Sequence, residues 1–148
     1  MRFSTGLEYA IHALVYLACM PADRPRLASE VAAAIDVPEA YLRKILQQLV
    51  RGGILSSLRG VRGGVRLARD PSQITLRHVV EAVEGSLPAY DCLRLRRGCS
   101  LGTDCPVRLQ FERARRAMGA VLDETSMGDL ATELAGRRDG ARWLRLKV

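Results

Sequence analysis

The chain lacks any long apolar segment. Its longest apolar stretch covers residues 7–19, where Glu8 and His12 interrupt the run, so it is too short and too polar to span a bilayer. No cleavage site of small residues follows, which speaks against a secretory signal. Hydrophobic residues still make up 48% of the 148 residues, which excludes a disordered chain and suffices for one domain, or one domain with an extension. We therefore expect a cytoplasmic protein with no membrane partner.

The chain also lacks a constellation for catalysis. It contains only two histidines, and no pair of carboxylates stands in a pocket-like context. The glycine-rich segment 60–64 lacks the Gly-Lys-Ser or Gly-Lys-Thr ending of a phosphate-binding loop, and it precedes a predicted strand. We therefore predict that the protein is not an enzyme and has no small-molecule substrate.

Cysteine is scarce and unevenly placed. Three of the four cysteines, Cys92, Cys99 and Cys105, fall in one short stretch with six and five residues between them. Few apolar residues flank these thiols, and Gly98 and Gly102 let the stretch fold back on itself. Because cytosolic thiols are kept reduced, this pattern favours a metal or iron–sulfur site over disulfides. Three sulfur donors leave such a site one ligand short.

The first half of the chain predicts three helices followed by a hairpin. Apolar residues at helical spacing predict helices over residues 4–20, 27–35 and 38–51. Two short β-prone runs, 55–59 and 65–68, flank a tip rich in glycine. This order is typical of a winged helix-turn-helix. On the third helix, the inward-facing residues are predicted to be Tyr41, Leu42, Ile45, Leu49 and Val50.

Acidic residues are almost missing from the segment between Pro38 and Arg69. The segment holds one, Glu39, against seven basic residues, in a chain of net charge +7 and pI near 9.8. The seven are Arg43, Lys44, Arg51, Arg59, Arg62, Arg66 and Arg69. A helix and hairpin with this charge suit the phosphate backbone of DNA, so double-stranded DNA is the predicted partner. Ordinary solvated arginines are the competing interpretation.

The second half predicts further helices. Apolar spacing predicts a helix over residues 75–84 and a long helix over residues 106–124. In the long helix, apolar residues recur at steps of 4, 3, 4 and 3: Val107, Phe111, Ala114, Met118 and Val121. This spacing suits pairing with a helix of a second chain, although a core-facing helix would have the same pattern. Ser126 with Asp129 predicts the start of a last short helix.

These elements divide the chain into four parts. Residues 1–84 form the predicted winged helix-turn-helix DNA-binding domain, and residues 85–105 form the cysteine loop. Residues 106–135 form a predicted dimerisation helix with a short terminal helix, followed by a basic tail at 136–148. The predicted fold is mainly α with a small β-hairpin.

Three blocks of the sequence resemble the Rrf2 family of winged-helix transcription regulators, of the cluster-sensing IscR, NsrR and RirA type. They are MRFSTGLEYAIHALVYLA at 1–18, PEAYLRKILQQLVRGGILSSLRGVRGGVRLA at 38–68, and the three cysteines followed by TSMGDLA at 125–131. The resemblance covers nearly the whole chain. It implies a homodimer that binds a palindromic operator, with the third helix in the major groove and the wing in the minor groove.

The resemblance also implies which residues contact DNA. On the recognition helix they are Glu39, Ala40, Tyr41, Arg43 and Lys44. On the wing they are Arg59, Gly60, Arg62, Gly63 and Gly64. Arginines of a wing suit narrow A·T-rich minor grooves. Arg43 stands where some relatives have an acidic residue, so their operator preference is not carried over, and an arginine here can read guanine bidentately.

The three cysteines fall on the family's cluster-ligand positions. Some relatives add a histidine three residues after the last cysteine, but this chain has Arg108 there, which stays protonated and cannot ligate. In other relatives the first helix of the partner chain supplies a ligand, often a carboxylate. Glu8 has that position, and His12 lies one turn along the same face. A surface hydrogen bond between Glu8 and His12 is the competing interpretation. By this resemblance, three cysteines with Glu8 favour a 4Fe–4S cluster. Two cysteines with both Glu8 and His12 of the first helix suit a 2Fe–2S cluster.

The sequence thus predicts a DNA-binding transcriptional regulator, in the simplest case a repressor. An iron–sulfur cluster that senses iron, redox state or nitric oxide would control its operator affinity. The alternative is a zinc or thiol switch built on the same cysteines. An iron–sulfur carrier or metalloprotein without DNA binding would not need the basic hairpin. Outside these motifs, we expect Cys19 to be a buried free thiol and His78 to be an exposed side chain.

Overall fold

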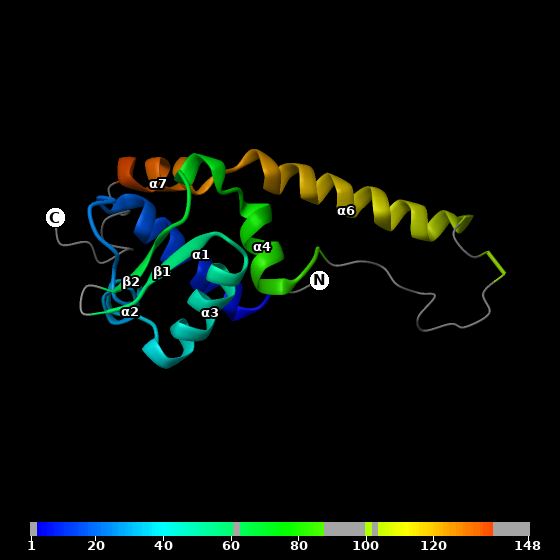
Figure 1. The fold of residues 1–148 in the computed structure, drawn as a ribbon. Helices are drawn as coiled ribbons and strands as arrows, with labels where there is room; N and C mark the ends of the chain where they lie inside the picture. The colour runs from blue at the N-terminus through cyan, green and yellow to red at the C-terminus, as the bar shows by residue number, and fades with distance from the viewer. Residues whose placement is uncertain (1–2, 61–62, 88–99, 102–103, 138–148) are drawn as a thin grey trace.

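The computed structural model describes residues 3–60, 63–87, 100–101 and 104–137. Within them, six α-helices, one short 3-10 helix and a two-stranded antiparallel sheet follow one another along the chain (Figure 1). This architecture confirms the predicted class, mainly α with a small β-hairpin. None of the helices in the described segments combines the length and apolarity needed to cross a membrane. The predictions for Arg62, Cys92, Cys99 and the basic tail fall outside the described residues.

Helix α1 (Thr5–Cys19) is the centre of the core. Ser4 caps it, because its Oγ accepts a hydrogen bond from the backbone N–H of Leu7 at 3.3 Å. The helix packs against α2, α3, α4 and α7, so side chains on several of its faces are buried. The buried residues are Gly6, Leu7, Ala10, Ala13, Leu14, Val15, Tyr16 and Leu17. Helix α1 therefore holds the other elements in place.

Helices α2 (Ala28–Ile35) and α3 (Glu39–Arg51) form the helix-turn-helix. Between them Asp36 adopts the left-handed conformation, with φ at 56°, which turns the chain sharply into α3. Helix α3 is strongly amphipathic and packs against α1, α2 and α4. Its buried residues are Leu42, Ile45, Leu46 and Leu49. Apolar burial thus fixes one face of α3 and leaves the other to solvent.

Strands β1 (Leu55–Leu58) and β2 (Gly64–Leu67) form the wing. They pair antiparallel, in a register that runs from Leu55 opposite Leu67 to Leu58 opposite Gly64. The two strands lie within one residue of the β-prone runs predicted at 55–59 and 65–68.

Arg26 ties the wing to the loop between α1 and α2. Its backbone N–H donates to the carbonyl oxygen of Val65, and the N–H of Val65 donates back to the carbonyl of Arg26, both at 2.8 Å. This antiparallel bridge lies on the edge of β2 that β1 does not occupy, so β2 is paired on both sides. Strand β2 is therefore held at both of its edges.

The second half of the described chain comprises a 3-10 helix (Pro71–Gln73), α4 (Leu76–Glu84), α6 (Pro106–Glu124) and α7 (Met127–Gly136). Helix α7 packs along α1 and the 3-10 helix, whereas α6 packs on α4. Figure 1 shows α6 projecting away from the core, with its N-terminal end outermost. Within α6, all of which is described, Gly119 is the one buried residue.

Candidate nucleic-acid interface and cysteine site

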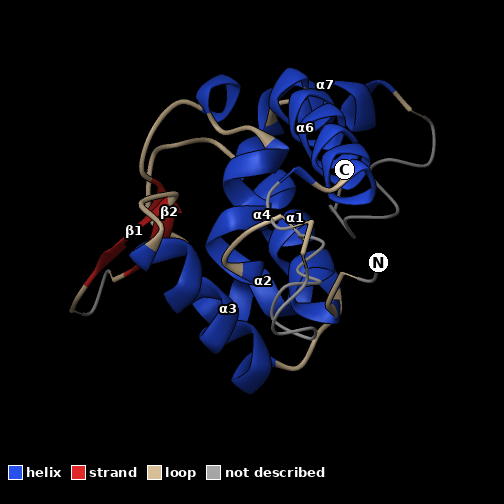
Figure 2. Cartoon of the chain, turned by 90° about the vertical axis from the view of Figure 1, so that its right-hand side faces the viewer, coloured by secondary structure: helices blue, strands red, loops and turns tan. Residues whose placement is uncertain are grey.

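The free face of α3 carries most of the predicted base-reading residues. Ala40, Tyr41, Arg43 and Lys44 are exposed, and Glu39 is half-buried. Helix α3 and the wing lie on the side of the domain away from α6 and α7 (Figures 1 and 2). This arrangement leaves α3 accessible to the major groove of a duplex.

Arg43 is tied to Glu39 one turn earlier on α3. Its Nε donates to Oε1 of Glu39 at 2.9 Å, and its Nη2 contacts the same oxygen. The Arg43 side chain is 63% exposed, so the pair adds little to stability. The carboxylate instead competes with any base edge for the guanidinium. To read guanine bidentately, Arg43 must exchange Glu39 for the base.

Tyr41 does not face inward, so that prediction is wrong. It is 41% exposed, and its ring meets the ring of Tyr9 edge-on, with centroids 5.7 Å apart and planes at 86°. Such an edge-to-face pair holds an aromatic ring at the rim of a core. The contact links α1, at the residue after Glu8, directly to the recognition helix.

Two glycines are required where the hairpin turns back into β2. A Cβ on Gly63 would lie 2.5 Å from the carbonyl oxygen of Leu58. A Cβ on Gly64, whose φ is 146°, would lie 2.5 Å from the carbonyl oxygen of Arg26. Neither position has room for a side chain. These glycines therefore act by shaping the wing, whichever atoms of the tip meet DNA.

A crevice of about 280 Å³ separates α3 from the wing. Its lining residues are Ala28, Arg43, Leu46, Gln47, Val50, Arg51, Ser57 and Val65, none of which is acidic. At the nearby tip, Arg59 and Gly60 are exposed. Cationic side chains thus come from both elements predicted to contact DNA, as phosphate binding requires.

The structure describes one of the three predicted thiol ligands, Cys105. This residue precedes α6 as its N-cap and is 9% exposed. It lies at the outermost end of the helix (Figure 1). Among the described residues, no three His, Cys, Asp or Glu side chains gather as metal ligands would. The described part of a single chain therefore does not assemble the predicted site.

Arg108 lies one turn into α6 from Cys105. Its Nη1 is buried and meets no hydrogen-bond acceptor among the described residues. Cluster sulfides and cysteine thiolates accept hydrogen bonds, so an unsatisfied donor three residues after Cys105 in the sequence fits a sulfur-rich group. Cysteine thiolate and histidine imidazole are known ligands of such clusters. The residues therefore fit an iron–sulfur cluster by their chemistry.

The two predicted non-thiol ligands lie on α1. Glu8 is exposed and His12 is half-buried. Burial lowers the pKa of His12, and the carboxylate of Glu8 partly offsets that effect. A lower pKa favours the neutral imidazole, which is the form that binds metal. Helix α6 carries Cys105 away from the core, and hence away from α1 of the same chain (Figure 1).

Two predictions outside the motifs need correction. Cys19 is half-buried instead of buried, with its Sγ 4.0 Å from the carbonyl oxygen of Ala131, and burial raises the pKa of the thiol. His78 is not an exposed side chain, because its Nδ1 accepts the backbone N–H of Thr75 at 3.1 Å and completes the cap of α4. The three-residue step from Thr75 to His78 is the sequence signal for this role.

The chain matches the Rrf2 family, described as "Iron-dependent Transcriptional regulator", over residues 3–133. The regulator NsrR of Geobacillus kaustophilus is 30% identical over 139 residues, which covers 93% of this chain and 95% of that protein. Protein aau3 of Rhizobium meliloti is 36% identical over 131 residues, covering 88% and 84%.

Solved structures give the same fold. CymR, the global cysteine regulator of B. subtilis, aligns with a TM-score of 0.73 at 26% identity and covers 90% of this chain and 98% of its own. IscR of T. potens aligns with a TM-score of 0.71 at 23% identity, covering 97% and 96%. The family and the NsrR relative are described as transcriptional regulators, not as enzymes. With its helix-turn-helix, its basic wing and a family match over nearly its whole length, this DNA-binding chain belongs to the Rrf2 family of transcriptional regulators.

Proposed function

We propose that the protein is a homodimeric repressor controlled by an iron–sulfur cluster. Cys92, Cys99 and Cys105 of one chain and Glu8 of the partner subunit would hold a 4Fe–4S cluster. A 2Fe–2S cluster held by two cysteines, Glu8 and His12 is the variant of this proposal. The observation that carries it is the place of Cys105, at the tip of a helix that leaves its own core (Figure 1).

The apolar face of α6 supports the dimer. Val107 and Phe111 are each 51% exposed and Val121 is 63% exposed, at the spacing of a helix-pairing seam. Pairing this seam with its copy in a second chain would remove it from water. It would also bring the tip of α6, with Cys105, toward the partner's winged-helix domain.

The contacts of α1 support a route from the cluster to DNA. When bound, the cluster supplies a link between the chains that is sensitive to redox state, iron supply or nitric oxide. Glu8 is adjacent to Tyr9, whose ring touches Tyr41 on α3. A displacement of α1 therefore reaches the recognition helix. Because a palindromic operator fixes the spacing of the two recognition helices, a small displacement would lower affinity.

The first experiment measures visible absorbance, iron and sulfide in protein purified without oxygen. We expect a brown protein whose colour is lost in Cys99→Ala and Cys105→Ala. Cys19→Ala is the matched control and should keep its colour, because Cys19 packs near Ala131 on the other side of the core. The ratio of iron to sulfide per dimer distinguishes 4Fe–4S from 2Fe–2S. A wild-type protein that stays colourless after reconstitution with iron and sulfide contradicts the cluster.

The second experiment compares DNA binding with and without the cluster. Operator fragments selected from random duplexes are titrated with holo and apo protein under nitrogen. We expect at least a tenfold difference in affinity, corresponding to about 1.4 kcal/mol. Equal affinities would leave DNA binding intact and remove the sensing function.

A cluster-free thiol switch is the second candidate. CymR, titled a cysteine regulator, shares the fold over 90% of this chain, and a CymR from Staphylococcus aureus is also known in an oxidized form. Under this candidate, the protein contains no iron, and peroxide would oxidise its cysteines. Mass spectrometry would show the added oxygen or a disulfide, and the affinity for DNA would change with it. Zinc analysis of the same sample separates a zinc site from bare thiols.

A further inference from the structure

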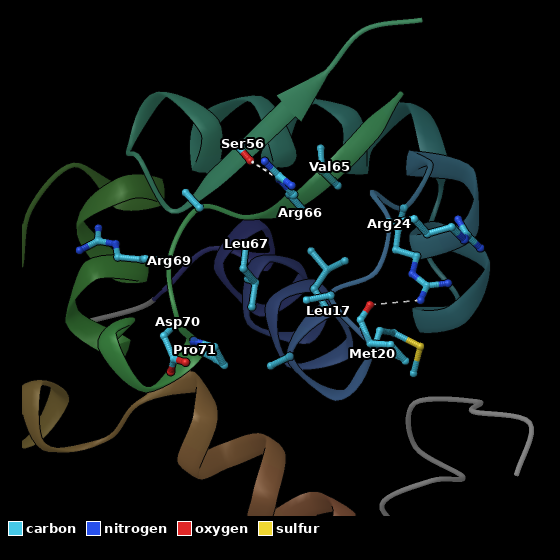
Figure 3. A pocket seen from close by; sticks show the side chains of 15 residues that line it. Leu17, Met20, Arg24, Ser56, Val65, Arg66, Leu67, Arg69, Asp70 and Pro71 are labelled. Atoms are coloured by element: carbon cyan, nitrogen blue, oxygen red, sulfur yellow. Dashed lines mark hydrogen bonds between the residues drawn. The ribbon is translucent and has the colours of Figure 1, made fainter. Parts of the chain in front are cut away.

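A pocket of about 580 Å³ lies between the C-terminal end of α1, the loop that follows it and strand β2 (Figure 3). Its volume falls within the range of roughly 300–1,000 Å³ that is usual for small-molecule sites. It is separate from the crevice beside α3, with which it shares Val65 alone among the lining residues. None of the residues predicted to read DNA on α3 or at the wing tip, and none of the predicted cluster ligands, lines this pocket, although Arg66 and Arg69 belong to the basic segment 38–69.

The pocket is rich in arginine. Arg24, Arg26, Arg66 and Arg69 line it, against one lining carboxylate, that of Asp70. Two of the arginines already have acidic partners. Arg24 pairs with Glu30 at 2.8 Å, and Arg26 pairs with Asp23 at 3.3 Å.

The other two arginines have no acidic partner among the described residues. Arg66 reaches the hydroxyl of Ser56 at 3.4 Å, as Figure 3 shows. The carboxylate of Asp70 is occupied by Ser72, whose N–H and hydroxyl donate to it at 2.9 and 2.5 Å. Asp70 keeps its negative charge while Ser72 donates to it, so Arg66 and Arg69 together leave a net positive charge at the pocket.

Arg26 contributes a second, independent sign of a missing acceptor. Its side chain is 14% exposed, and its Nε is buried with no hydrogen-bond partner in the described part of the chain. Its Nη2 is 3.4 Å from the carbonyl oxygen of Pro21. The backbone of Arg26 is fixed by its bridge to Val65, so the residue cannot shift as a whole to find another acceptor. Buried N–H donors in proteins are almost always paired, so the unpaired Nε indicates an acceptor missing beside the pocket, either a water or a ligand oxygen.

Apolar side chains line the rest of the pocket. Leu17 and Met20 come from α1 and its C-terminal cap, Leu67 from β2, and Pro71 from the start of the 3-10 helix (Figure 3). Such a surface offers nothing to a phosphodiester backbone, but it suits the carbon skeleton of a small molecule. We propose that this pocket binds a small organic anion, an apolar body with one carboxylate or phosphate group that meets arginine side chains of the pocket lining.

Phenyl phosphate, which combines a phosphate with an apolar ring, is a suitable probe. It is titrated into the full-length protein by calorimetry and by NMR of the arginine Nε–H groups. We expect saturable binding that shifts the Arg26 signal, and an affinity about tenfold lower in Arg66→Gln and in Arg69→Gln. Arg116→Gln on α6, where the side chain is 76% exposed, is the matched charge control and should bind like wild type. Inorganic phosphate, the charged half of the probe, and phenol, its aromatic half, should each bind at least about tenfold more weakly.

Three results would overturn the proposal. Absence of saturable binding would mean that water satisfies Arg26. Equal affinity for inorganic phosphate would reduce the pocket to a patch of positive charge. Loss of operator binding in Arg66→Gln and Arg69→Gln, together with displacement of the probe by operator DNA, would assign these arginines to the DNA interface. Arg26→Lys, which keeps the charge and removes the Nε–H, tests the individual contact.

Discussion

The winged-helix domain and α6 differ in where their apolar faces go. In the domain, the apolar faces of α1 and α3 are covered by the same chain, and Leu14, Leu42 and Leu49 are fully buried. In α6, which has an equally regular apolar repeat, Val107 and Phe111 remain half exposed. The same kind of pattern thus builds a core in one region and an open seam in the other. A heptad-like repeat therefore predicts that a helix has an apolar face suited to packing. It does not tell whether the same chain or a second chain would cover that face.

The largest effect is expected from Leu49→Ala in the domain. Leu49 is fully buried on the inner face of α3, so the change removes apolar contacts and leaves a cavity. We expect a loss of about 2–5 kcal/mol in the free energy of unfolding, measured by urea denaturation. Gln47→Ala, on the exposed face of the same helix, is the control and should change it by less than about 0.5 kcal/mol. Equal losses would refute the assignment of faces on α3.

The next effect tests the seam. Phe111→Ala should raise the dissociation constant of the proposed dimer by about ten- to hundredfold, since burial of such side chains contributes about 1.5–3 kcal/mol. Analytical ultracentrifugation measures the dissociation constant, and circular dichroism should show unchanged helix content in the monomer. Gln110→Ala, a neighbouring exposed position, provides the control. If Phe111→Ala instead unfolds the domain and leaves association unaltered, then α6 contributes to the stability of the domain and not to dimerisation.

A smaller effect is expected at the junction between the two regions. Ser126 caps α7, because its Oγ accepts the N–H of Asp129 at 3.1 Å and donates to the Asp129 carboxylate at 2.6 Å. Ser126→Ala should lower the free energy of unfolding by about 1 kcal/mol, seen as a reduced Tm. Thr132→Ala removes an exposed hydroxyl bonded to Gly128 within the same helix and should be nearly neutral. A neutral Ser126→Ala would mean that α7 is held by packing alone.

The smallest effect concerns pH. A hydrogen bond from Arg24, aided by the N–H of Leu27, lowers the pKa of Glu30 to about 2. Since the folded-state pKa lies below the ordinary value of 4.5, the stabilisation is complete above about pH 4.5 and is lost as pH falls toward 2. The gap in stability between wild type and Glu30→Gln should shrink over that range and stay below about 1 kcal/mol, because the pair is solvent-exposed. Glu133→Gln on α7, 70% exposed, should show no such gap.

The helices and the wing could be predicted from the sequence because their signals are local. Periodic apolar residues and caps such as Ser4, Thr75 and Ser126 placed the described helices to within about a residue of their observed ends. The predictions failed for side chains whose exposure depends on contacts between elements. Tyr41 is turned outward by its contact with Tyr9, and Leu27, predicted within the second helix, precedes α2 and is 48% exposed.

The candidate sites were predictable to different degrees. The basic α3 and wing could be inferred because their charge is contiguous in sequence. The Glu39–Arg43 pair had a four-residue spacing as its signal, yet its consequence for base reading emerges only from the geometry. The arginine pocket had no signal, because the β-bridge brings Arg26 next to a strand some forty residues later in the chain. The cysteine site stays a prediction, since the described part of one chain does not assemble it.

Helix α6 is also a lever. About two thirds of its 19 residues precede Gly119, its one buried residue, and correspond to a length of about 20 Å. The C-terminal end is held by packing on α4, by the ion pair of Asp123 with Arg77 and by the backbone bridge between Thr75 and Ser126. A tilt of about 5° about that end would move Cys105 by about 1.7 Å, given that length. A bond made or broken at Cys105 therefore acts on these contacts through a long arm.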